Sequence, residues 1–333
     1  MEYEKENKKD IRRVLVTGGA GYIGSCLVAL LLERGYKVRI LDNFVFGRES
    51  LKNLEKNKNL QIFEGDIRNI EDLDESMEGV DAVVHLAGLV GMKHCKTHER
   101  AALQVNKLAT NTLVDVCNVN KVKRIIFAST CSVYGSSTGT LDENSPTNPL
   151  ESYAQSKLDS EKIILKRADK NICPTVLRFG TVFGPSRRMR FDLVANVLVA
   201  KALHEGKISI FGGSQWRPLV HTEDIARAIL AVIEADEQKV NGQVFNVGGN
   251  KNNFQIKELG EKIKENFKDV VISFESIDDN RDYKVSFDKI EKTLGFVPIY
   301  GIEEGVEQMK HLLQDEISDY KDEIYYNVAY KYR

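Results

Sequence analysis

Short apolar runs alternate with stretches of helical periodicity along the first half of the chain. Continuous apolar runs predict strands at residues 12–17, 37–41, 60–64, 80–86, 122–129 and 173–179. Apolar positions at helical spacing predict helices at residues 22–34, 48–57, 98–119 and 150–168. Strands that are apolar on both faces and alternate with helices are typical of a doubly wound parallel sheet. We therefore expect an α/β fold.

A glycine-rich turn joins the first predicted strand to the first helix, in Val14-Leu-Val-Thr-Gly-Gly-Ala-Gly-Tyr-Ile-Gly24. Its glycines allow a sharp turn and a close approach of the backbone to a pyrophosphate, which the N–H groups at the helix start then face. Asp42 ends the second strand, where its carboxylate can accept hydrogen bonds from ribose hydroxyls and would repel a 2′-phosphate. The arrangement predicts a dinucleotide site that favours NAD over NADP.

The alternation loosens beyond residue 180. The pattern there predicts an amphipathic stretch at 191–203, a strand at 208–211, a helix at 222–235 and a strand at 244–247, and from about residue 254 two helices with one or two short strands. We expect residues 1–180 to form an NAD-binding Rossmann-type domain that also receives residues 220–247. Residues 181–333 are then expected to form mainly a smaller, interleaved α/β lobe that binds the substrate.

Composition narrows the class of protein. The net charge is −2, with acids and bases mixed along the chain, so we expect no binding to nucleic acid. The first ten residues are charged and no run approaches a membrane span, so neither secretion nor membrane insertion is expected. Cysteines at positions 26, 95, 117, 131 and 173 form no C-x-x-C pair, and the histidines show no metal-ligand spacing. We expect a cytoplasmic protein without a metal site.

Tyr153 and Lys157 stand four residues apart in a predicted helix, which places both side chains on one face. A phenol has a pKa of about 10, but a nearby ammonium and an oxidised nicotinamide favour its phenolate. The preceding strand ends in the hydroxyls Ser129, Thr130 and Ser132, where the carboxyl ends of parallel strands line a ligand crevice. These residues predict acid–base chemistry on an alcohol.

Together these residues resemble the extended short-chain dehydrogenase/reductase superfamily, in its NAD-dependent sugar-nucleotide epimerase/dehydratase branch. The resemblance runs from Thr17-Gly-Gly-Ala-Gly-Tyr-Ile-Gly24 to Leu294-Gly-Phe296. It implies NAD as cofactor, a nucleotide-diphosphate sugar as substrate, and Thr130, Tyr153 and Lys157 as the catalytic trio. The cofactor-binding positions that it implies are Gly18, Gly21, Tyr22, Ile23, Gly24, Asp42, Asn43, Asp66, Ile67, Leu86, Ala87, Gly88, Ser129, Tyr153, Lys157, Phe179 and Val182.

The same resemblance implies the substrate contacts. Guanidinium forks suit bidentate binding of the substrate's phosphates. The family usually has a substrate-contacting Asn where this chain has Thr181, which is a departure from its pattern. The substrate-binding positions are Val90, Thr130, Ser132, Thr181, Arg190, Asn196, Arg217 and Arg281.

The family's reactions share one opening step, in which Tyr153 removes the C4 hydroxyl proton as hydride passes from C4 to NAD. Its 4,6-dehydratases need an Asp-Glu pair directly after the catalytic Thr, and this chain has Cys131-Ser132, which disfavours dehydration. We expect a 4-epimerase; a C4 dehydrogenase, a 4-ketoreductase and an NAD-sensing scaffold without turnover are alternatives. The resemblance also suggests a homodimer through the helices at 98–119 and 150–168.

Overall fold

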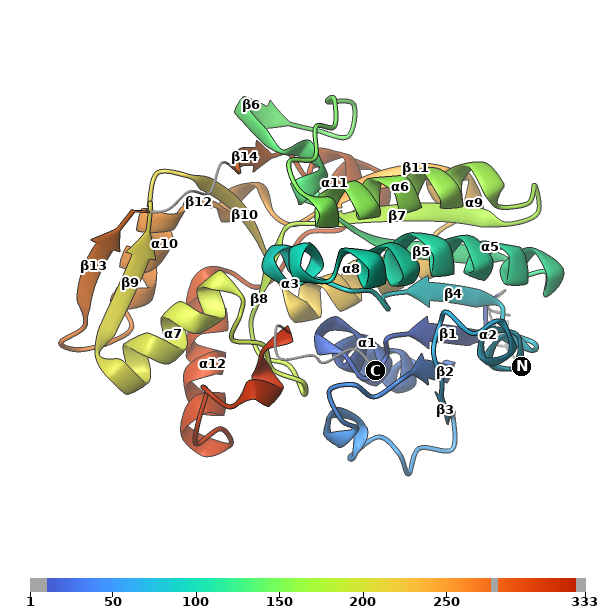
Figure 1. The fold of residues 1–333 in the computed structure, drawn as a ribbon, viewed down its shortest axis with the longest axis horizontal. Coiled ribbons are helices and arrows are strands. Elements are labelled where there is room, and N and C mark those ends of the chain that lie inside the picture. Colours follow the sequence, from blue (N-terminus) through green and yellow to red (C-terminus); the bar gives the residue numbers. More distant parts are fainter. Residues whose placement is uncertain (1–10, 277–280, 328–333) are drawn as a thin grey trace, which may run out of the picture.

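A parallel sheet forms the centre of the molecule. The computed structural model describes residues 11–276 and 281–327 of the 333. Within these ranges seven strands pair in the order β11-β7-β5-β4-β1-β2-β3, every pair parallel (Figure 1). Their bounds are β1 (Arg13–Thr17), β2 (Lys37–Asp42), β3 (Leu60–Glu64), β4 (Ala82–His85), β5 (Arg124–Thr130), β7 (Cys173–Phe179) and β11 (Gln243–Val247). The Rossmann-type sheet is confirmed.

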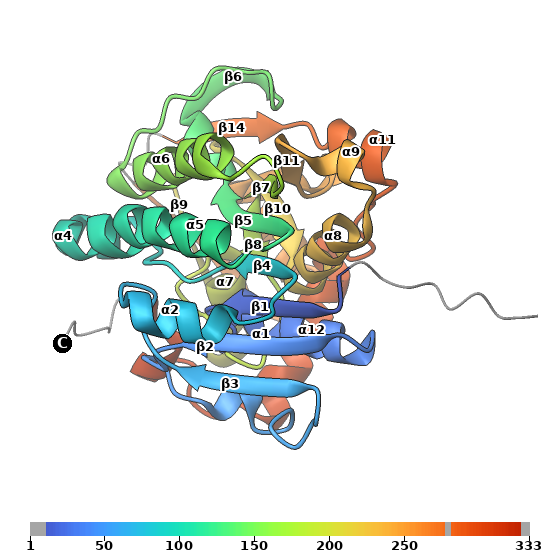
Figure 2. The same ribbon diagram turned by 90° about the vertical axis from the view of Figure 1, so that its right-hand side faces the viewer.

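Helices cover both faces of this sheet (Figure 2). On one face, α1 (Tyr22–Glu33) packs against α8 (Thr222–Glu234) through a core that includes Leu27, Leu31 and Ile229. The helices α2 (Ile70–Met77), α5 (Ala109–Val119) and α6 (Ser152–Arg167) cover the other face. Burying each large aliphatic side chain stabilises the fold by about 1.5–3 kcal/mol. Strands that are covered by helices on both faces are therefore apolar on both faces.

The second lobe lies beyond the carboxyl ends of the strands, at the left of Figure 1. Its described sheets are β8-β10-β12 and the pair β9-β13. Its elements are β8 (Thr181–Phe183), α7 (Val194–Glu205), β9 (Lys207–Phe211), β10 (Trp216–His221), β12 (Asn253–Gln255), α10 (Ile256–Lys264), β13 (Val271–Glu275) and α12 (Ile302–Asp315). A separate core cluster, with Phe183, Phe191 and Leu219 at its centre, holds them together.

Smaller elements complete the described fold. They are α3 (Met92–Thr97), α4 (Glu99–Ala102), β6 (Ser136–Leu141), α9 (Glu237–Val240), β14 (Asp282–Val285), α11 (Asp288–Leu294) and the short helical turns η1 (Glu49–Leu51), η2 (Leu103–Leu108), η3 (Cys131–Tyr134), η4 (Asn250–Asn252) and η5 (Glu323–Tyr325). The predicted strands agree with the structure to within two residues. The charged residues 1–10 and the end of the Tyr-rich tail lie outside the described residues.

The predicted helix at 48–57 is wrong. The structure has only η1 there, followed by turns. Ser50 donates its hydroxyl to the carbonyl oxygen of Ala20 at 2.8 Å, and Asn57 accepts from the backbone of Asn59 at 3.0 Å. The local bond of Asn57 competes with a helix at the end of this segment, whereas the Ser50 bond ties η1 to the glycine turn. The helix α2, in an acidic segment, was not predicted.

The predicted helix at 98–119 contains a wide turn. A π-helical segment, η2, separates α4 from α5. Its Asn106 faces inward, accepts from the backbone N–H of Leu89 at 2.7 Å and donates to the carbonyl of Leu89 at 2.9 Å. Wide turns of this kind are frequent at functional sites, and this one fixes the loop that follows β4.

The two lobes interlock. The strand β11 comes from beyond residue 180 but joins the central sheet beside β7. The Tyr22 hydroxyl donates to the carbonyl of Gly184 at 2.6 Å, and the hydroxyls of Ser25 and Ser186 lie 3.1 Å apart. Along the described ranges, no helix has the length and apolar character that a membrane crossing requires.

Candidate active site

A cavity of about 770 Å³ opens between the central sheet and the second lobe. The glycine turn, the ends of β4 and β5, the start of α6 and the segment after β8 form its walls. Every position predicted to bind cofactor lines it, as does every predicted substrate position except Asn196. The fold therefore gathers in one place residues that are scattered from position 18 to position 281.

The glycine turn leaves no room for side chains. Gly18 has φ +74°, and a Cβ there would come within 2.8 Å of the backbone nitrogen of Ala87. A Cβ on Gly24 would collide with the carbonyl oxygen of Gly18. The first turn of α1 lines the cavity and has no acidic residue and no side-chain cap, which leaves its N–H groups available to a phosphate.

Two carboxylates mark the part of the cavity at the ends of β2 and β3. Asp42 accepts hydrogen bonds from the backbone N–H groups of Ala20 and Phe44, both at 2.9 Å. Burial raises the pKa of Asp42, and these bonds lower it in part. Asp66 pairs with Arg68 at 2.7 Å; burial acts to raise its pKa, but the bonds and charge of Arg68 outweigh this and hold it below the ordinary value.

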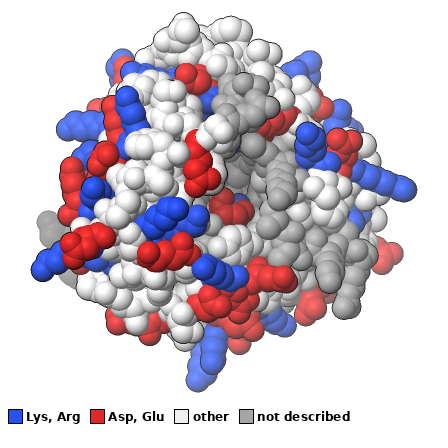
Figure 3. Space-filling view, turned by 60° about the vertical axis from the view of Figure 1, so that its left-hand side comes forward, with Lys and Arg blue, Asp and Glu red and all other residues white. Residues whose placement is uncertain are grey.

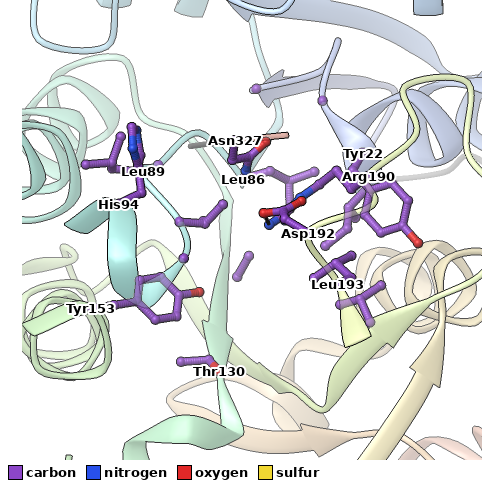
Figure 4. A pocket seen from close by; sticks show the side chains of 18 of the residues that line it. Tyr22, Leu86, Leu89, His94, Thr130, Tyr153, Arg190, Asp192, Leu193 and Asn327 are labelled. Atoms are coloured by element: carbon purple, nitrogen blue, oxygen red, sulfur yellow. Dashed lines mark hydrogen bonds and ion pairs between the residues drawn. The ribbon is translucent and has the colours of Figure 1, made fainter. Parts of the chain in front are cut away.

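Tyr153 and Lys157 lie on α6, facing the end of β5. Lys157 is buried, its Nζ lies 4.8 Å from the ring centroid of Phe127, and burial lowers its pKa to about 8. The Tyr153 hydroxyl points into the cavity beside Thr130 (Figure 4). Burial, and to a lesser degree the neighbouring Cys95, raises the pKa of Tyr153 well above its ordinary value.

A chain of hydroxyls continues from the end of β5. Thr130 donates its Oγ1–H to Ser132 Oγ at 3.1 Å, and Ser132 Oγ lies 3.2 Å from the hydroxyl of Tyr283 on β14. Cys131, between the two, is fully buried and directs its thiol at the carbonyl oxygen of Arg178, 3.2 Å away. The hydroxyls therefore face the cavity and the thiol faces the core.

A buried ion pair is hydrogen-bonded to the end of β5. Glu161 on α6 receives two hydrogen bonds from Arg178 on β7, at 3.0 and 2.7 Å. Ser129 donates its hydroxyl to the same carboxylate, and Arg178 also donates to the hydroxyl of Tyr134 at 3.0 Å. The network fixes the backbone next to Thr130.

The cavity is more cationic than the outer surface. On the face in Figure 3, basic and acidic side chains are interspersed rather than gathered by sign. Among the described residues that line the cavity, Lys and Arg outnumber Asp and Glu. Arg190 forms a two-fold ion pair with Asp192, at 3.0 and 2.7 Å, and Arg217 donates to the carbonyl of Arg281 at 2.7 Å. Such a lining favours anionic ligands.

Asn196 requires a correction. The expectation was a direct contact with substrate, but its side chain is fully buried beside the cavity. Its Oδ1 accepts from the backbone of Gly184 at 3.1 Å, and its Nδ2 donates to Tyr22 and to the carbonyl of Arg190, each at 2.9 Å. Asn196 therefore positions the segment that carries Arg190.

Sequence reasoning missed several residues of the lining. Tyr283 could have been found from the alternation of buried and half-buried residues along β14. Asp192 lies between Arg190 and Asn196, the two positions that the resemblance implied there, and nothing local in the sequence indicates Asn327. The other missed polar or aromatic residues are Phe46, Arg68, His94, Arg188, Lys201, Ser209, Phe211 and Gln215.

Comparison with known proteins identifies the class. Residues 14–248 match the model of the NAD dependent epimerase/dehydratase family, and the chain belongs to this family. It is 31% identical to a UDP-glucose 4-epimerase of Corynebacterium glutamicum over 76% of this chain and 80% of the relative. It is also 31% identical to the dTDP-D-glucose 4,6-dehydratase of Homo sapiens, over 76% and 75%.

A solved structure extends the likeness across the fold. The UDP-glucuronic acid 4-epimerase from Bacillus cereus, solved with UDP-glucuronic acid and NAD, is 28% identical with a TM-score of 0.80. The match covers 90% of this chain and 99% of that one. This chain is an NAD-dependent enzyme of the sugar-nucleotide epimerase/dehydratase class, and the side-chain-free glycine turn fits that cofactor. Across the described residues, no three His, Cys, Asp or Glu side chains gather as metal ligands.

Proposed function

We propose that this enzyme is a nucleotide-sugar 4-epimerase. One observation carries the proposal: Tyr153, Thr130 and Ser132 share one cavity, while Cys131 is buried behind it. The residue after Thr130 therefore cannot act on a bound sugar. Tyr153 is placed to move a proton at the hydroxyl of the substrate.

The charges of the cavity support this choice over dehydration. Dehydration needs a further acid and base near the sugar to move the C5 and C6 protons. Among the described lining residues, the carboxylates are Asp42, Asp66 and Asp192. Asp42 and Asp66 end or follow the strands β2 and β3, in the predicted cofactor half, and Asp192 is paired with Arg190. None of these three carboxylates therefore serves as the further acid or base that dehydration needs.

In the proposed reaction, the phenolate oxygen of Tyr153 takes the proton of the C4 hydroxyl, and Thr130 Oγ1 holds that oxygen by a hydrogen bond. Lys157 keeps a positive charge beside Tyr153 and binds the nicotinamide ribose. Bound NAD supplies the hydride acceptor at C4 and the source of the returning hydride. The 4-keto sugar would rotate in the cavity, so that its opposite face receives the returning hydride at C4, and Tyr153 would return the proton to the C4 oxygen. The arginines Arg190, Arg217 and Arg281 hold the diphosphate meanwhile.

The interlock of the lobes favours epimerisation over net oxidation or reduction. A C4 dehydrogenase or 4-ketoreductase must exchange its cofactor in every cycle, whereas an epimerase retains it. The contacts from Tyr22 to Gly184 and from Ser25 to Ser186 tie the helix of the glycine turn to the substrate lobe. Such ties slow the opening that cofactor release requires.

The test is a panel of UDP-, GDP-, CDP- and dTDP-sugars, followed by NMR of the sugar and by NADH absorbance. We expect inversion at C4 without net NADH. The Tyr153→Phe variant should bind NAD and lose turnover by ~10²–10⁴-fold, the scale of a lost general acid–base group. Net NADH would instead indicate a dehydrogenase. Bound NAD without any turnover would indicate a sensing scaffold.

We also propose a homodimer formed through α5, α6 and the segments before them. Leu103 and Leu108 on η2 and Leu150 before α6 are 48%, 52% and 45% exposed, so apolar surface is uncovered on the segments before α5 and α6. Burying such residues against a second copy would recover their hydrophobic free energy. Light scattering after gel filtration tests this: Leu108→Glu should yield monomer where the parent chain yields dimer.

A cytoplasmic location is proposed from the thiols. All five cysteines are unpaired, and Cys95, Cys117, Cys131 and Cys173 are buried. Unpaired thiols are typical of a reducing compartment. Fractionation of the source cells tests the location.

A further inference from the structure

The C-terminal segment, residues 316–327, folds back onto the cavity. It follows α12 and is tied to the loop that carries the charged residues of the site. The backbone N–H of Phe191 donates to the carbonyl of Tyr325 at 3.0 Å, and Arg188 donates to the carbonyl of Ile324 at 3.3 Å. The segment therefore forms part of the site's wall.

Aromatic side chains hold the segment in place. The ring of Phe191 meets Tyr320 and Tyr325 edge to face, with centroids 5.7 and 5.5 Å apart. Tyr320 donates its hydroxyl to Glu205 of α7, and Lys321 pairs with the same carboxylate at 2.8 Å. These contacts give a function to the tyrosines near the end of the chain: they dock the segment.

Docking brings Asn327 into the cavity. Its side chain points into the same space as Leu86, Arg190 and Asp192 (Figure 4). Asn327 is only 6% exposed, and its Oδ1 finds no hydrogen-bond donor in the part of the chain that the structure describes. A buried carbonyl oxygen without a donor costs about 1–3 kcal/mol, so a bound molecule that supplies one is favoured there.

We propose that Asn327 is a cofactor-binding residue whose Oδ1 accepts a hydrogen bond from a ribose hydroxyl of NAD. The unpaired atom is an acceptor, so it needs a donor, and the phosphates of NAD only accept. Leu86 belongs to the predicted cofactor wall after β4, and the neighbouring Arg190 lies 6.0 Å from the ring of Tyr22 in the glycine turn. Asn327 thus lines the cavity where the predicted cofactor wall approaches the first turn of α1. The inference rests on the NAD dependence of the family and is independent of the reaction proposed above.

The experiment compares binding of NAD, ADP-ribose and ADP to the parent chain, Asn327→Ala and Glu323→Ala by calorimetry. Glu323 is exposed on the same segment, and its substitution is the matched control. Asn327→Ala should weaken NAD about 3–10-fold, the scale of one neutral hydrogen bond, while Glu323→Ala binds as the parent does. If Asn327→Ala weakens the binding of NAD and ADP-ribose but not of ADP, the hydroxyl that contacts Asn327 belongs to the nicotinamide-side ribose. If it weakens the binding of all three molecules, the hydroxyl belongs to the adenosine ribose.

A second measurement distinguishes a direct contact of Asn327 with NAD from a role of Asn327 in holding the C-terminal segment in place. The amide of Phe191 should keep its hydrogen-exchange protection in Asn327→Ala, and the melting temperature should not fall, because the Oδ1 that is removed has no donor among the described residues. Unchanged NAD affinity overturns the proposal. Loss of affinity together with loss of Phe191 protection also overturns it, since Asn327 would then be an anchor of the segment.

Discussion

The Nζ atom of Lys157 donates a hydrogen bond to the carbonyl oxygen of Ala128 at 2.9 Å. The ammonium is therefore held at the end of β5, one turn of α6 away from the phenol of Tyr153, rather than bonded to that phenol. Lys157 therefore makes no hydrogen bond to the phenol that would lower its pKa. This agrees with the raised pKa of Tyr153.

The first prediction follows from that geometry. Without cofactor, burial keeps Tyr153 protonated above pH 10; with NAD, the pyridinium and the Lys157 ammonium together should lower its pKa toward neutrality. Each unit of this fall corresponds to ~1.4 kcal/mol, and a fall from above 10 to neutrality takes more than ~3 units, or more than ~4 kcal/mol. The phenolate absorbance of the parent chain minus that of Tyr153→Phe, titrated with and without NAD, measures the shift. An identical titration in both conditions would contradict the proposed base.

A second prediction concerns the glycine turn. Gly24→Ala places a methyl group against the carbonyl of Gly18 and 2.8 Å from the Cα of Gly19, so the turn must move. Overpacking of this kind costs about 1–3 kcal/mol, which lowers NAD affinity ~5- to 150-fold if the cost falls on binding. Gly139→Ala is the matched control, because its Cβ meets nothing within 4 Å. Equal NAD affinity in the two variants would disprove the assignment of the turn.

A third prediction concerns the buried pair of Glu161 and Arg178, whose side chains are 3% and 7% exposed. Glu161→Gln removes the charge opposite Arg178 and should lower the free energy of unfolding by about 3–5 kcal/mol. Asp236→Asn breaks the exposed pair with Lys239, 4.0 Å apart, and should cost less than about 1 kcal/mol. Urea unfolding of both variants checks this. A small loss in Glu161→Gln would mean that the network does not support the end of β5.

Local patterns explain why much of the site could be predicted from the sequence. The glycine turn, Asp42 and the Tyr153–Lys157 pair are each encoded within one strand–turn–helix unit or one helical turn, so spacing alone reveals them. The sheet could be predicted for the same reason, since buried strands are continuous apolar runs. The predicted helix at 48–57 failed because Asn57 bonds to the nearby backbone and Ser50 is held by a tertiary contact with the backbone of Ala20.

The remaining site residues depend on contacts between distant segments. Asn327 reaches the cavity only because Tyr320 and Tyr325 pack on Phe191, more than a hundred positions earlier. Asn196 shows the opposite case. Its residue type suits a phosphate, but in the tertiary structure its amide forms hydrogen bonds with Tyr22 and Gly184. Spacing along the chain carries no information about either outcome.

A last prediction concerns stability below neutral pH. His85 at the end of β4 is 1% exposed, with its ring nitrogens 2.8 Å from the hydroxyl of Thr17 and 3.0 Å from that of Thr110. Burial lowers the pKa of His85 to about 3, and the charge of Lys157 acts in the same direction. In the unfolded chain the pKa is about 6.5. Below that pH the unfolded state takes up the proton and the folded state does not, so stability falls as pH falls between about 6.5 and 3.

At pH ~5 this difference amounts to about 2 kcal/mol. In His85→Gln the loss of unfolding free energy between pH ~7.5 and ~5 should be smaller than in the parent chain by that amount, whatever the variant's stability at neutral pH. His311→Gln, at a histidine whose side chain is 66% exposed, is the control and should keep the parent's pH dependence. Equal pH dependence in His85→Gln and the parent chain would show that His85 is protonated in the folded state. The ammonium of Lys157 would then have a second cation beside it, which would oppose the positively charged nicotinamide that the proposed mechanism requires.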